Sequence, residues 1–298
     1  MTEFRSIGKF EYKAPESLPG ALMILEAENR ACKVMAGGTD LILQMKQGLA
    51  NPSSLLDVKR IPELNRLGWS EKDGLYIGAA VPFSRLLAFS ELPKEVDILR
   101  QACSLIGSIQ IKNRGSIGGN ICNAAPSADS APPLLCLEAG AVLASNRGNR
   151  TLPLDAFFLG PGKTALADDE LLVKIEIRKP PAPSAGCYLR HTTREEMDIA
   201  VASVASLLSL SPQTGELRSV RIALGAVAPT PRRASEAEAF LTGKKITEAM
   251  IEEAAEKAAE AADPVSDIRA SSEYRLELVR VLTRRTLRRA CESLGIEQ

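Results

Sequence analysis

The chain has 298 residues, of which 45% are hydrophobic and 25% are charged, and its 37 basic side chains balance its 37 acidic ones. A chain of this length is expected to form about two domains and to bury roughly three quarters of its unfolded surface. Because the formal charges cancel, bulk electrostatics does not favour nucleic acid or a membrane surface. We expect partners that are small molecules or other protein subunits.

Cysteine and histidine usage argues against a metal site. The six cysteines form no CxxC pair, and His191 is the only histidine. These spacings do not provide the ligands of a zinc site. The N-terminus has no apolar signal-peptide core, and no apolar run approaches the ~20 residues of a membrane-spanning helix. We therefore predict no bound metal, no transmembrane segment and a cytoplasmic protein.

From residue 10 to residue 56 the pattern predicts strand, helix, strand, helix and strand. The first helix begins near Ser17, which is a good N-cap. The apolar KVMAGG (33–38) predicts a strand that runs into a glycine turn, and TDLILQMKQG (39–48) predicts the second helix. LLDVKR (55–60) is apolar enough for a strand in a buried parallel sheet.

From residue 75 to residue 180 the order of expected strands and helices changes. LYIGAAV (75–81) predicts a strand, and PFSRLLAF (82–89) and EVDILRQACSLIG (95–107) predict two helices. A long, glycine-rich loop is expected from 108 to 133, and such a loop usually serves a function. The alternation in ELLVKIEIRKP (170–180) is typical of a half-solvated strand.

A proline-rich run, KPPAPSAG (179–186), predicts a linker and a domain boundary. After it, DIAVASVASLLSLS (198–211) and LRSVRIALGAVA (217–228) flank a turn signal and predict a β-hairpin. Three helices are then expected at about 233–241, 247–262 and 273–294. The pattern indicates a second domain of α+β type.

Gly37 and Gly38 allow close approach of the main chain to a ligand, because no Cβ stands in the way. Consecutive N–H groups and a following helix start can hold a pyrophosphate without lysine, and Thr39 adds a hydroxyl donor. The alternative is a simple strand-to-helix turn. No GxGxxG follows a strand in this chain, so a Rossmann-type NAD site has little support.

A second glycine pair lies in NRGSIGGNICNAAPSAD (113–129). Its small donors and open main chain belong to Ser116, Gly118, Gly119 and Asn120. Asp129 follows in a polar stretch that could reach a ribose or adenine donor. Two such loops suit a dinucleotide with two phosphates, while a surface Ω-loop is an equally open interpretation of this composition.

VMAGGTDLI (34–42) together with IKNRGSIGGNICNAAPSAD (111–129) closely resembles the FAD-binding medium subunit of molybdenum hydroxylases. The resemblance is to the aerobic carbon monoxide dehydrogenase type, which is related to the FAD domain of xanthine dehydrogenase. It extends through FFLGPGKTAL (157–166) and YLRHTTREEMDIAVASV (188–204) and so covers nearly the whole chain.

The resemblance implies an α+β fold with a two-part FAD-binding region of the vanillyl-alcohol-oxidase type. This region would span about residues 1–177, with subdomains at about 1–58 and 59–177. A C-terminal flavoprotein domain, a β-sheet with three helices, would span 186–298.

By the same resemblance, the two loops hold the FAD pyrophosphate from opposite sides. The first set of cofactor-binding residues is Val34, Met35, Ala36, Gly37, Gly38, Thr39, Asp40 and Leu41. The second set is Ser116, Ile117, Gly118, Gly119 and Asn120. Asp129 matches a cofactor-contacting aspartate, and Ile106 and Leu172 match apolar contacts, although both also fit an ordinary core. Arg190 stands where the family commonly carries lysine, which keeps the charge but changes its geometry and leaves its role open.

The function that the resemblance implies is electron transfer. FAD in this chain would accept electrons from a 2Fe-2S small subunit and pass them to an external acceptor, while a molybdenum-binding large subunit oxidises the substrate. A dimer of heterotrimers is implied. The molybdenum cofactor and the 2Fe-2S clusters are expected only in the partner subunits. Because the flavin performs the redox step, no catalytic side chain is predicted here.

Several alternatives stay open. The chain could be a non-redox nucleotide-binding assembly scaffold or a self-contained FAD oxidase. The substrate of the complex could be carbon monoxide, a purine or another N-heterocycle, an aldehyde or an aromatic acyl-CoA. Residues 136–160 lack the cysteine-bearing insertion that one family branch carries for a 4Fe-4S cluster, so no iron is predicted. The arginine-rich last helix favours a solvated face over a subunit contact or nucleic-acid binding.

Overall fold

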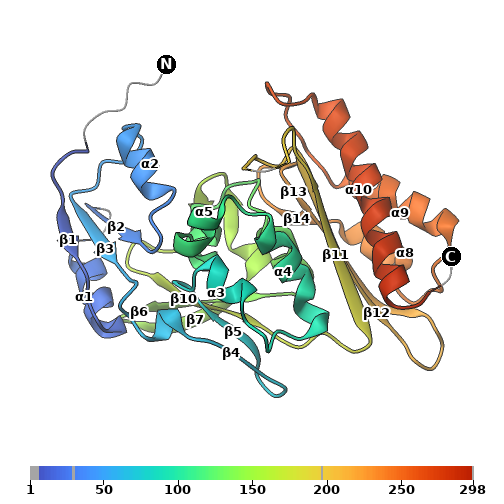
Figure 1. Cartoon of the computed structure of the whole chain (residues 1–298), viewed down its shortest axis with the longest axis horizontal. Helices are drawn as coiled ribbons and strands as arrows, with labels where there is room; N and C mark the ends of the chain where they lie inside the picture. Colours follow the sequence, from blue (N-terminus) through green and yellow to red (C-terminus); the bar gives the residue numbers. More distant parts are fainter. Residues whose placement is uncertain (1–6, 29–30, 196, 297–298) are drawn as a thin grey trace.

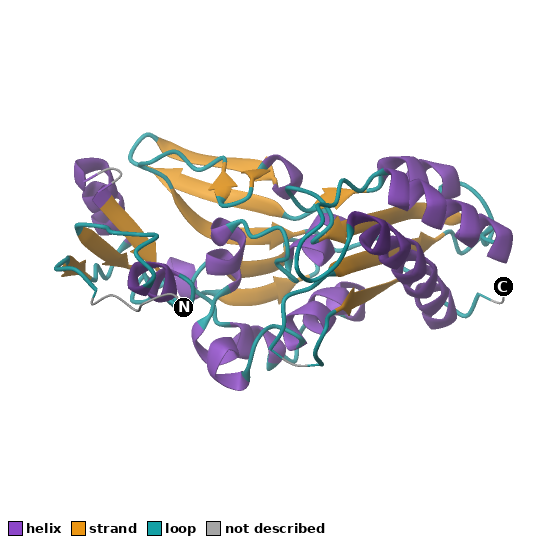
Figure 2. Ribbon diagram, turned by 90° about the horizontal axis from the view of Figure 1, so that it is seen from above, coloured by secondary structure: helices purple, strands orange, loops and turns teal. Residues whose placement is uncertain are grey.

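The computed structural model describes residues 7–28, 31–195 and 197–296. Within these residues, three larger sheets follow one another along the molecule, and a two-stranded sheet of β8 (Phe158–Gly160) and β9 (Lys163–Thr164) accompanies them. The N-terminal sheet lies at one end and the C-terminal helices gather at the other (Figures 1 and 2). No helix in the described part of the chain is both long and apolar enough to span a membrane.

The first sheet is small and parallel. Its strand order is β1 (Glu11–Lys13), β3 (Ser54–Asp57) and β2 (Cys32–Met35), and both pairings are parallel. Helix α1 (Leu18–Glu28) buries its apolar side, and α2 (Leu41–Lys46) follows β2 after the first glycine turn. The predicted strand and helix order and the parallel sheet are confirmed.

The second sheet is antiparallel and has five strands. Their order is β4 (Leu67–Ser70), β5 (Gly74–Gly78), β10 (Leu171–Ile177), β6 (Gly140–Ser145) and β7 (Gly148–Pro153). The predicted half-solvated strand at 170–180 is confirmed as β10, in which the partly exposed Lys174 and Glu176 alternate with the buried Val173, Ile175 and Ile177. β10 is the central strand of the sheet and is paired on both edges.

Helices cover this sheet. They are α3 (Phe83–Leu87), α4 (Asp97–Ser104), α5 (Ile109–Arg114), α6 (Ile117–Asn123) and α7 (Ala131–Cys136), with short 3₁₀ turns at Glu63–Asn65, Lys94–Val96 and Leu154–Ala156. The uninterrupted loop predicted from 108 to 133 is therefore wrong. Ser108 and Ser116 each cap a short helix with the side-chain oxygen, so the glycine pair lies inside α6.

The third sheet is antiparallel, in the order β11 (Ser184–His191), β12 (Ala202–Leu210), β13 (Leu217–Gly225) and β14 (Arg232–Arg233). The predicted β12–β13 hairpin is confirmed. The predicted linker 179–186 overlaps a strand, because β11 begins at Ser184 and pairs with β12 along its whole length. A proline disrupts a ladder only at its own position, so a strand can start directly after the last one.

The three predicted C-terminal helices are confirmed as α8 (Ser235–Leu241), α9 (Glu248–Glu260) and α10 (Ser272–Ser293). α8 and α10 pack on one face of the third sheet and α9 packs against these two helices, while α4 and α7 pack on the other face of the sheet. β12 shows the division, since Val204 belongs to the core under the helices and Ala205 to the core of the preceding region. The third sheet thus joins both parts of the chain.

The prediction that the arginines of α10 lie on a solvated face is correct for some of them and wrong for Arg275. Arg280, Arg284 and Arg288 form ion pairs with glutamates of α9 on the surface. Arg275 differs because its side chain is 5% exposed, donates to the Val201 carbonyl at 2.6 Å and pairs with Asp267 at 2.8 Å. It is a buried structural cation, which an amphipathic pattern does not predict.

The Asp267–Arg275 pair predicts an acid-sensitive contribution to stability. Hydrogen bonds from the Arg269 amide and then from the Arg275 side chain hold the pKa of Asp267 at about 2, against an ordinary 3.8. A depressed folded-state pKa means that the stabilisation is present above about pH 4 and is lost as pH falls towards 2. We expect Asp267→Asn to lower the urea midpoint at pH 6, with the difference from the native chain shrinking towards pH 2. A pH-independent difference would contradict this assignment.

Candidate functional site

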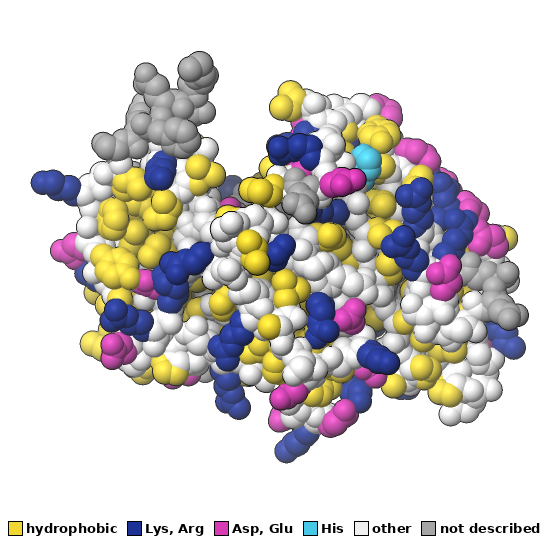
Figure 3. All heavy atoms as spheres, viewed as in Figure 1, with side chains coloured by type: hydrophobic (Ala, Val, Ile, Leu, Met, Phe, Trp, Pro, Cys, Tyr) yellow, Lys and Arg dark blue, Asp and Glu magenta, His cyan; other side chains and the backbone are white. Residues whose placement is uncertain are grey.

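The two glycine loops meet at one cavity of about 520 Å³, a size typical of small-molecule sites. The first loop follows β2, and the second runs from α5 into α6. Figure 3 shows this face of the molecule hollowed between the part that carries α2 and the C-terminal domain. The predicted residues that line the cavity are Val34, Met35, Ala36, Gly37, Gly38, Thr39, Asp40, Leu41, Ile106, Ser116, Gly118, Gly119, Asn120 and Leu172.

Glycine stands at these four positions for different physical reasons. A Cβ on Gly37 would lie 2.0 Å from the Arg114 carbonyl oxygen, and one on Gly118 would lie 2.5 Å from that of Ala79. These two positions need glycine because chain packs against chain. Gly38 has φ of +73°, which favours glycine. At Gly119 the one atom of the described residues within 4 Å of an added Cβ is Ser116 Oγ at 3.1 Å, a tight contact with a side chain and not with backbone.

The first loop is held through its carbonyl groups. The Val58 amide donates to the Met35 carbonyl and Lys59 Nζ donates to the Ala36 carbonyl, both at 3.0 Å. Within the described residues, the N–H groups of positions 37–39 donate to no protein acceptor. Free consecutive amides beside a cavity are suited to an anionic group such as a phosphate.

The second loop uses its amides internally. The Gly118 amide donates to the Ala79 carbonyl at 3.1 Å, and the Gly119 amide donates to Ser116 Oγ at 3.0 Å. The polar groups of this loop that remain at the cavity therefore include side chains. Asn120 is one of them, and its Oδ1 accepts a hydrogen bond from Ser130 Oγ at 2.7 Å.

Three charged residues line the cavity: Lys33, Asp40 and Glu170. Burial raises the pKa of Asp40. The hydrogen bond from Arg150 lowers the pKa of Glu170, whose carboxylate Arg150 holds at 2.6 Å, so this charge is already neutralised by the protein. Burial also raises the pKa of Cys122 to about 12, so its thiol stays protonated.

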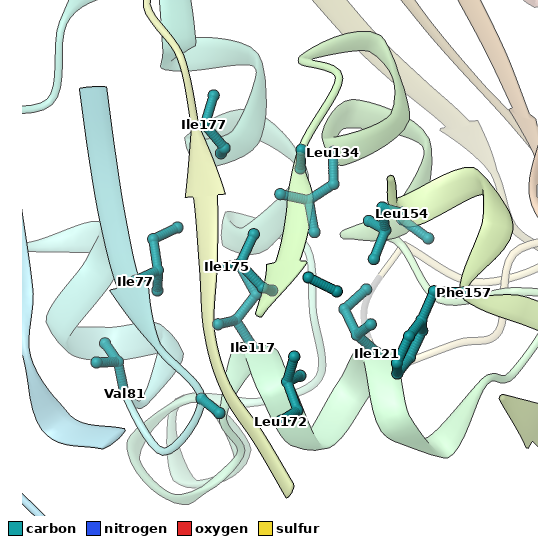
Figure 4. Close-up of a cluster of buried hydrophobic side chains, with 14 of the residues drawn as sticks. Ile77, Val81, Ile117, Ile121, Leu134, Leu154, Phe157, Leu172, Ile175 and Ile177 are labelled. Atoms are coloured by element: carbon teal, nitrogen blue, oxygen red, sulfur yellow. The ribbon is translucent and has the colours of Figure 1, made fainter. Parts of the chain in front are cut away.

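Three predicted residues lie outside the cavity lining. Ile117 is 1% exposed and points into the core formed with Leu172 and Ile175 of β10 (Figure 4). Its apolar side chain continues the packing of α6 on the sheet. The cavity in this structure therefore does not support a direct cofactor contact by the Ile117 side chain.

Asp129 and Arg190 also lie outside the lining and pair with each other. Arg190 Nη1 donates to Asp129 Oδ2 at 2.5 Å, and the Tyr188 hydroxyl donates to Asp129 Oδ1 at 2.5 Å. Both charged side chains are less than a tenth exposed. Burial raises the pKa of Asp129, and the Arg190 charge opposes that rise. The cluster connects β11 to the turn that follows the second loop.

Sequence reasoning missed half of the lining. The further residues are Lys33, Leu43, Gln44, Val58, Leu64, Ala79, Phe83, Ile111, Gly115, Cys122, Asn123, Leu166, Glu170 and Leu171. Gln44 and Asn123 had a usable signal, because each lies four residues after a predicted lining residue on the same helix face. Gln44 Nε2 donates to Asn123 Oδ1 at 3.3 Å and links α2 to α6.

The cavity takes its lining from both the small parallel sheet and the helix-covered antiparallel sheet, and the free amides of its first loop are suited to an anionic group. The comparisons with known proteins agree. A family model described as the FAD binding domain in molybdopterin dehydrogenase matches residues 8–180, and one described as the CO dehydrogenase flavoprotein C-terminal domain matches residues 188–290.

Similar proteins span nearly the whole chain. The xanthine dehydrogenase FAD-binding subunit of Escherichia coli O157:H7 is 33% identical, covering 95% of this chain and 97% of its own. The carbon monoxide dehydrogenase medium chain of Hydrogenophaga pseudoflava is 34% identical with the same coverage. A solved structure of carbon monoxide dehydrogenase from Hydrogenophaga pseudoflava superposes with a TM-score of 0.91 at 33% identity, covering 96% of this chain and 98% of that chain.

The chain belongs to the family of FAD-binding medium subunits of molybdenum hydroxylases of the carbon monoxide and xanthine dehydrogenase type. It is a two-domain, mixed helix and sheet oxidoreductase component with FAD as its cofactor, and its role is electron transfer. The family expected from the two loops is confirmed. In the described residues no cluster of three or more histidine, cysteine, aspartate or glutamate residues could hold a metal.

Proposed function

We propose that this chain holds FAD extended along the cavity between the two glycine loops, accepts electrons from a 2Fe-2S subunit and passes them to an external acceptor. The observation that carries the proposal is the convergence of the two loops, far apart in sequence, on one cavity. The free amides of residues 37–39 suit the pyrophosphate, and the lack of a side chain at Gly119, which lines the cavity, permits its close approach.

The chain's own residues bind and orient the cofactor, and the isoalloxazine of bound FAD supplies the redox chemistry. Amides of the first loop donate to phosphate oxygens, while apolar side chains such as Leu41, Ile106 and Leu172 exclude water from the rest of the cavity. No side chain is assigned a catalytic proton transfer. Asp129 and Arg190 join the site by holding the turn beside the second loop.

We extend the proposal to architecture. The first and second sheets form the two parts of an FAD-binding region of the vanillyl-alcohol-oxidase type, at about 1–58 and 59–177. The third sheet and its helices form the C-terminal domain, at about 186–298. The separate parallel and antiparallel sheets support the first division. A boundary of the last domain near residue 186 is supported by β11, which begins at Ser184 and belongs to the third sheet.

The partners in this proposal are a molybdenum-binding large subunit and a 2Fe-2S small subunit, in a cytoplasmic dimer of heterotrimers. The proposal draws support from relatives that are named as medium chains of carbon monoxide dehydrogenases. The substrate is determined in the large subunit, because relatives of comparable similarity are named for carbon monoxide and for xanthine.

Flavin titration of the full chain tests the proposal. We expect FAD to bind at least about 100-fold more tightly than FMN or riboflavin, because charge-assisted hydrogen bonds contribute about 1.5–3 kcal/mol each and FAD alone brings the full pyrophosphate. Quenching of flavin fluorescence measures the three dissociation constants. If the chain bound FMN as tightly as FAD, the protein would not recognise the second phosphate and the adenosine of the dinucleotide.

The same preparation separates the alternatives. Absence of any flavin binding, in a folded sample that also contains the neighbouring subunits, would favour a nucleotide-binding assembly scaffold. Steady turnover of a substrate by the chain alone would favour a self-contained FAD oxidase. Electron transfer predicts flavin binding without such turnover.

A further inference from the structure

Asn120 is the polar side chain of the second loop whose orientation decides what it can bind. One end of its carboxamide is occupied, since Oδ1 accepts the hydrogen bond from Ser130 Oγ at 2.7 Å. No protein group within the described residues accepts from the other end, Nδ2. Asn120 lines the cavity and is partly exposed there. A carboxamide held by its oxygen presents two N–H donors at its free end.

The hydroxyl of Ser130 determines which end is free. Ser130 is 0% exposed, and in the described structure its side chain has Asn120 as its hydrogen-bond partner. If the carboxamide were reversed, Ser130 would accept from Nδ2 and its buried hydroxyl proton would have no acceptor in place. A buried donor without an acceptor is costly because it has lost its hydrogen bonds to water, and this favours the observed orientation.

Ser130 is itself held from the C-terminal domain. The preceding residue, Asp129, is fixed by the Tyr188 hydroxyl and the Arg190 guanidinium of β11, each at 2.5 Å. Ser130 does not use its side chain to cap α7, which begins at the next residue, although serine is a favoured N-cap. Its hydroxyl is instead committed to Asn120. A line of contacts thus runs from β11 through 129–130 to the second loop.

We propose that Ser130 is a positioning residue that holds the Asn120 carboxamide with its NH₂ group free at the cavity, where it donates to a phosphate oxygen of the bound dinucleotide. The inference rests on the proposed function, because it requires the dinucleotide in this cavity. It adds a side-chain donor to the second loop, whose amides at Gly118 and Gly119 are already used within the protein.

The test is the ratio of the dissociation constants for riboflavin and FAD, measured on the full chain. Riboflavin has the isoalloxazine of FAD but lacks its pyrophosphate and adenosine, so the ratio reports recognition of that part of the cofactor and not general loosening. We expect Ser130→Ala to lower the ratio about 10-fold, the effect of misorienting one charge-assisted hydrogen bond, with riboflavin affinity unchanged. Equal loss of affinity for both ligands, or an unchanged ratio, would overturn the proposal.

Ser206→Ala is the matched control. Ser206 is also 0% exposed and also has a hydrogen bond of 2.7 Å, to Thr286 Oγ1 between β12 and α10. Both variants remove one buried hydroxyl and are expected to lower the unfolding midpoint similarly. Only Ser130→Ala is expected to change the ligand ratio. A comparable change in Ser206→Ala would mean that the ratio follows stability, which overturns the positioning role.

Asn120 variants complete the test. In an Asn120→Ala background, Ser130→Ala should change the ratio less than about 2-fold, because the side chain that it positions is gone. Asn120→Asp keeps an acceptor for Ser130 but places a carboxylate where the NH₂ group was, and should lower the ratio at least about 100-fold. An additive double variant, or normal FAD selectivity in Asn120→Asp, would refute the proposal. Failure of the native chain to bind FAD would instead reject the proposed function and this inference with it.

Discussion

Gly119→Val is expected to lower FAD affinity by about 100-fold or more while the chain stays folded. Gly119 lines the cavity, and among the described residues the one atom within 4 Å of an added Cβ is Ser116 Oγ, a side-chain oxygen at 3.1 Å that must shift slightly to accept it. The added side chain would take up space that the cofactor needs. Displacing a pyrophosphate from two charge-assisted hydrogen bonds removes about 3 kcal/mol or more, which corresponds to this loss. Flavin content and a fluorescence titration measure it.

Two further glycines provide the controls. Gly118→Val should destabilise or unfold the chain, because its Cβ would lie 2.5 Å from the Ala79 carbonyl oxygen. Gly68→Val, in β4 with no atom within 4 Å of the added Cβ, should bind FAD normally. Circular dichroism checks folding in each case. Normal FAD affinity in a folded Gly119→Val would remove the second loop from the proposed site.

Arg190→Leu is expected to lower the free energy of unfolding by about 3–5 kcal/mol. The substitution leaves the Asp129 carboxylate buried, with the Tyr188 hydroxyl as its remaining side-chain hydrogen-bond partner among the described residues. Removing one member of a buried ion pair is costly because the remaining charge stays out of water. Urea denaturation followed by circular dichroism measures the change. We also expect weaker FAD retention, since this cluster holds the turn beside the second loop.

Two further variants are controls for Arg190→Leu. Arg190→Lys keeps the charge and should lose less stability than Arg190→Leu, although lysine lacks the planar fork of arginine. Replacing both partners, as Asp129→Leu with Arg190→Leu, should recover part of the loss because no uncompensated charge remains. If Arg190→Leu were as stable as the native chain, the buried pair would contribute nothing and the proposed link from β11 would lack support.

Much of the element order could be predicted from the sequence, because hydrophobic periodicity survives without tertiary information. The β12–β13 hairpin and the last three helices have long or strongly patterned segments and were placed correctly. The helices inside 108–133 were missed because they have six or seven residues and one of them contains the glycine pair. Short helices receive their stability from packing, here from Ile117 and Ile121 on β10.

The sequence predicts where the site lies but not what each of its residues does. The two loops identify the cavity, yet the sequence treats its glycines as equivalent. Their neighbours separate them: an added Cβ at Gly37 or Gly118 would meet backbone from elsewhere in the fold, whereas at Gly119 it would meet the side-chain oxygen of Ser116. The partnership of Asp129 with Arg190 joins residues from two parts of the chain, so only the tertiary structure reveals it.

Hydrogen–deuterium exchange of the full chain, with and without FAD, tests the central claim most directly. Peptides that cover 34–41 and 116–120 report the two loops separately in one experiment. If both loops hold one dinucleotide, FAD should slow amide exchange in both peptides, with the largest change at 37–39, where the amides have no protein acceptor among the described residues. Protection confined to one loop, or to neither, would contradict a shared cofactor site.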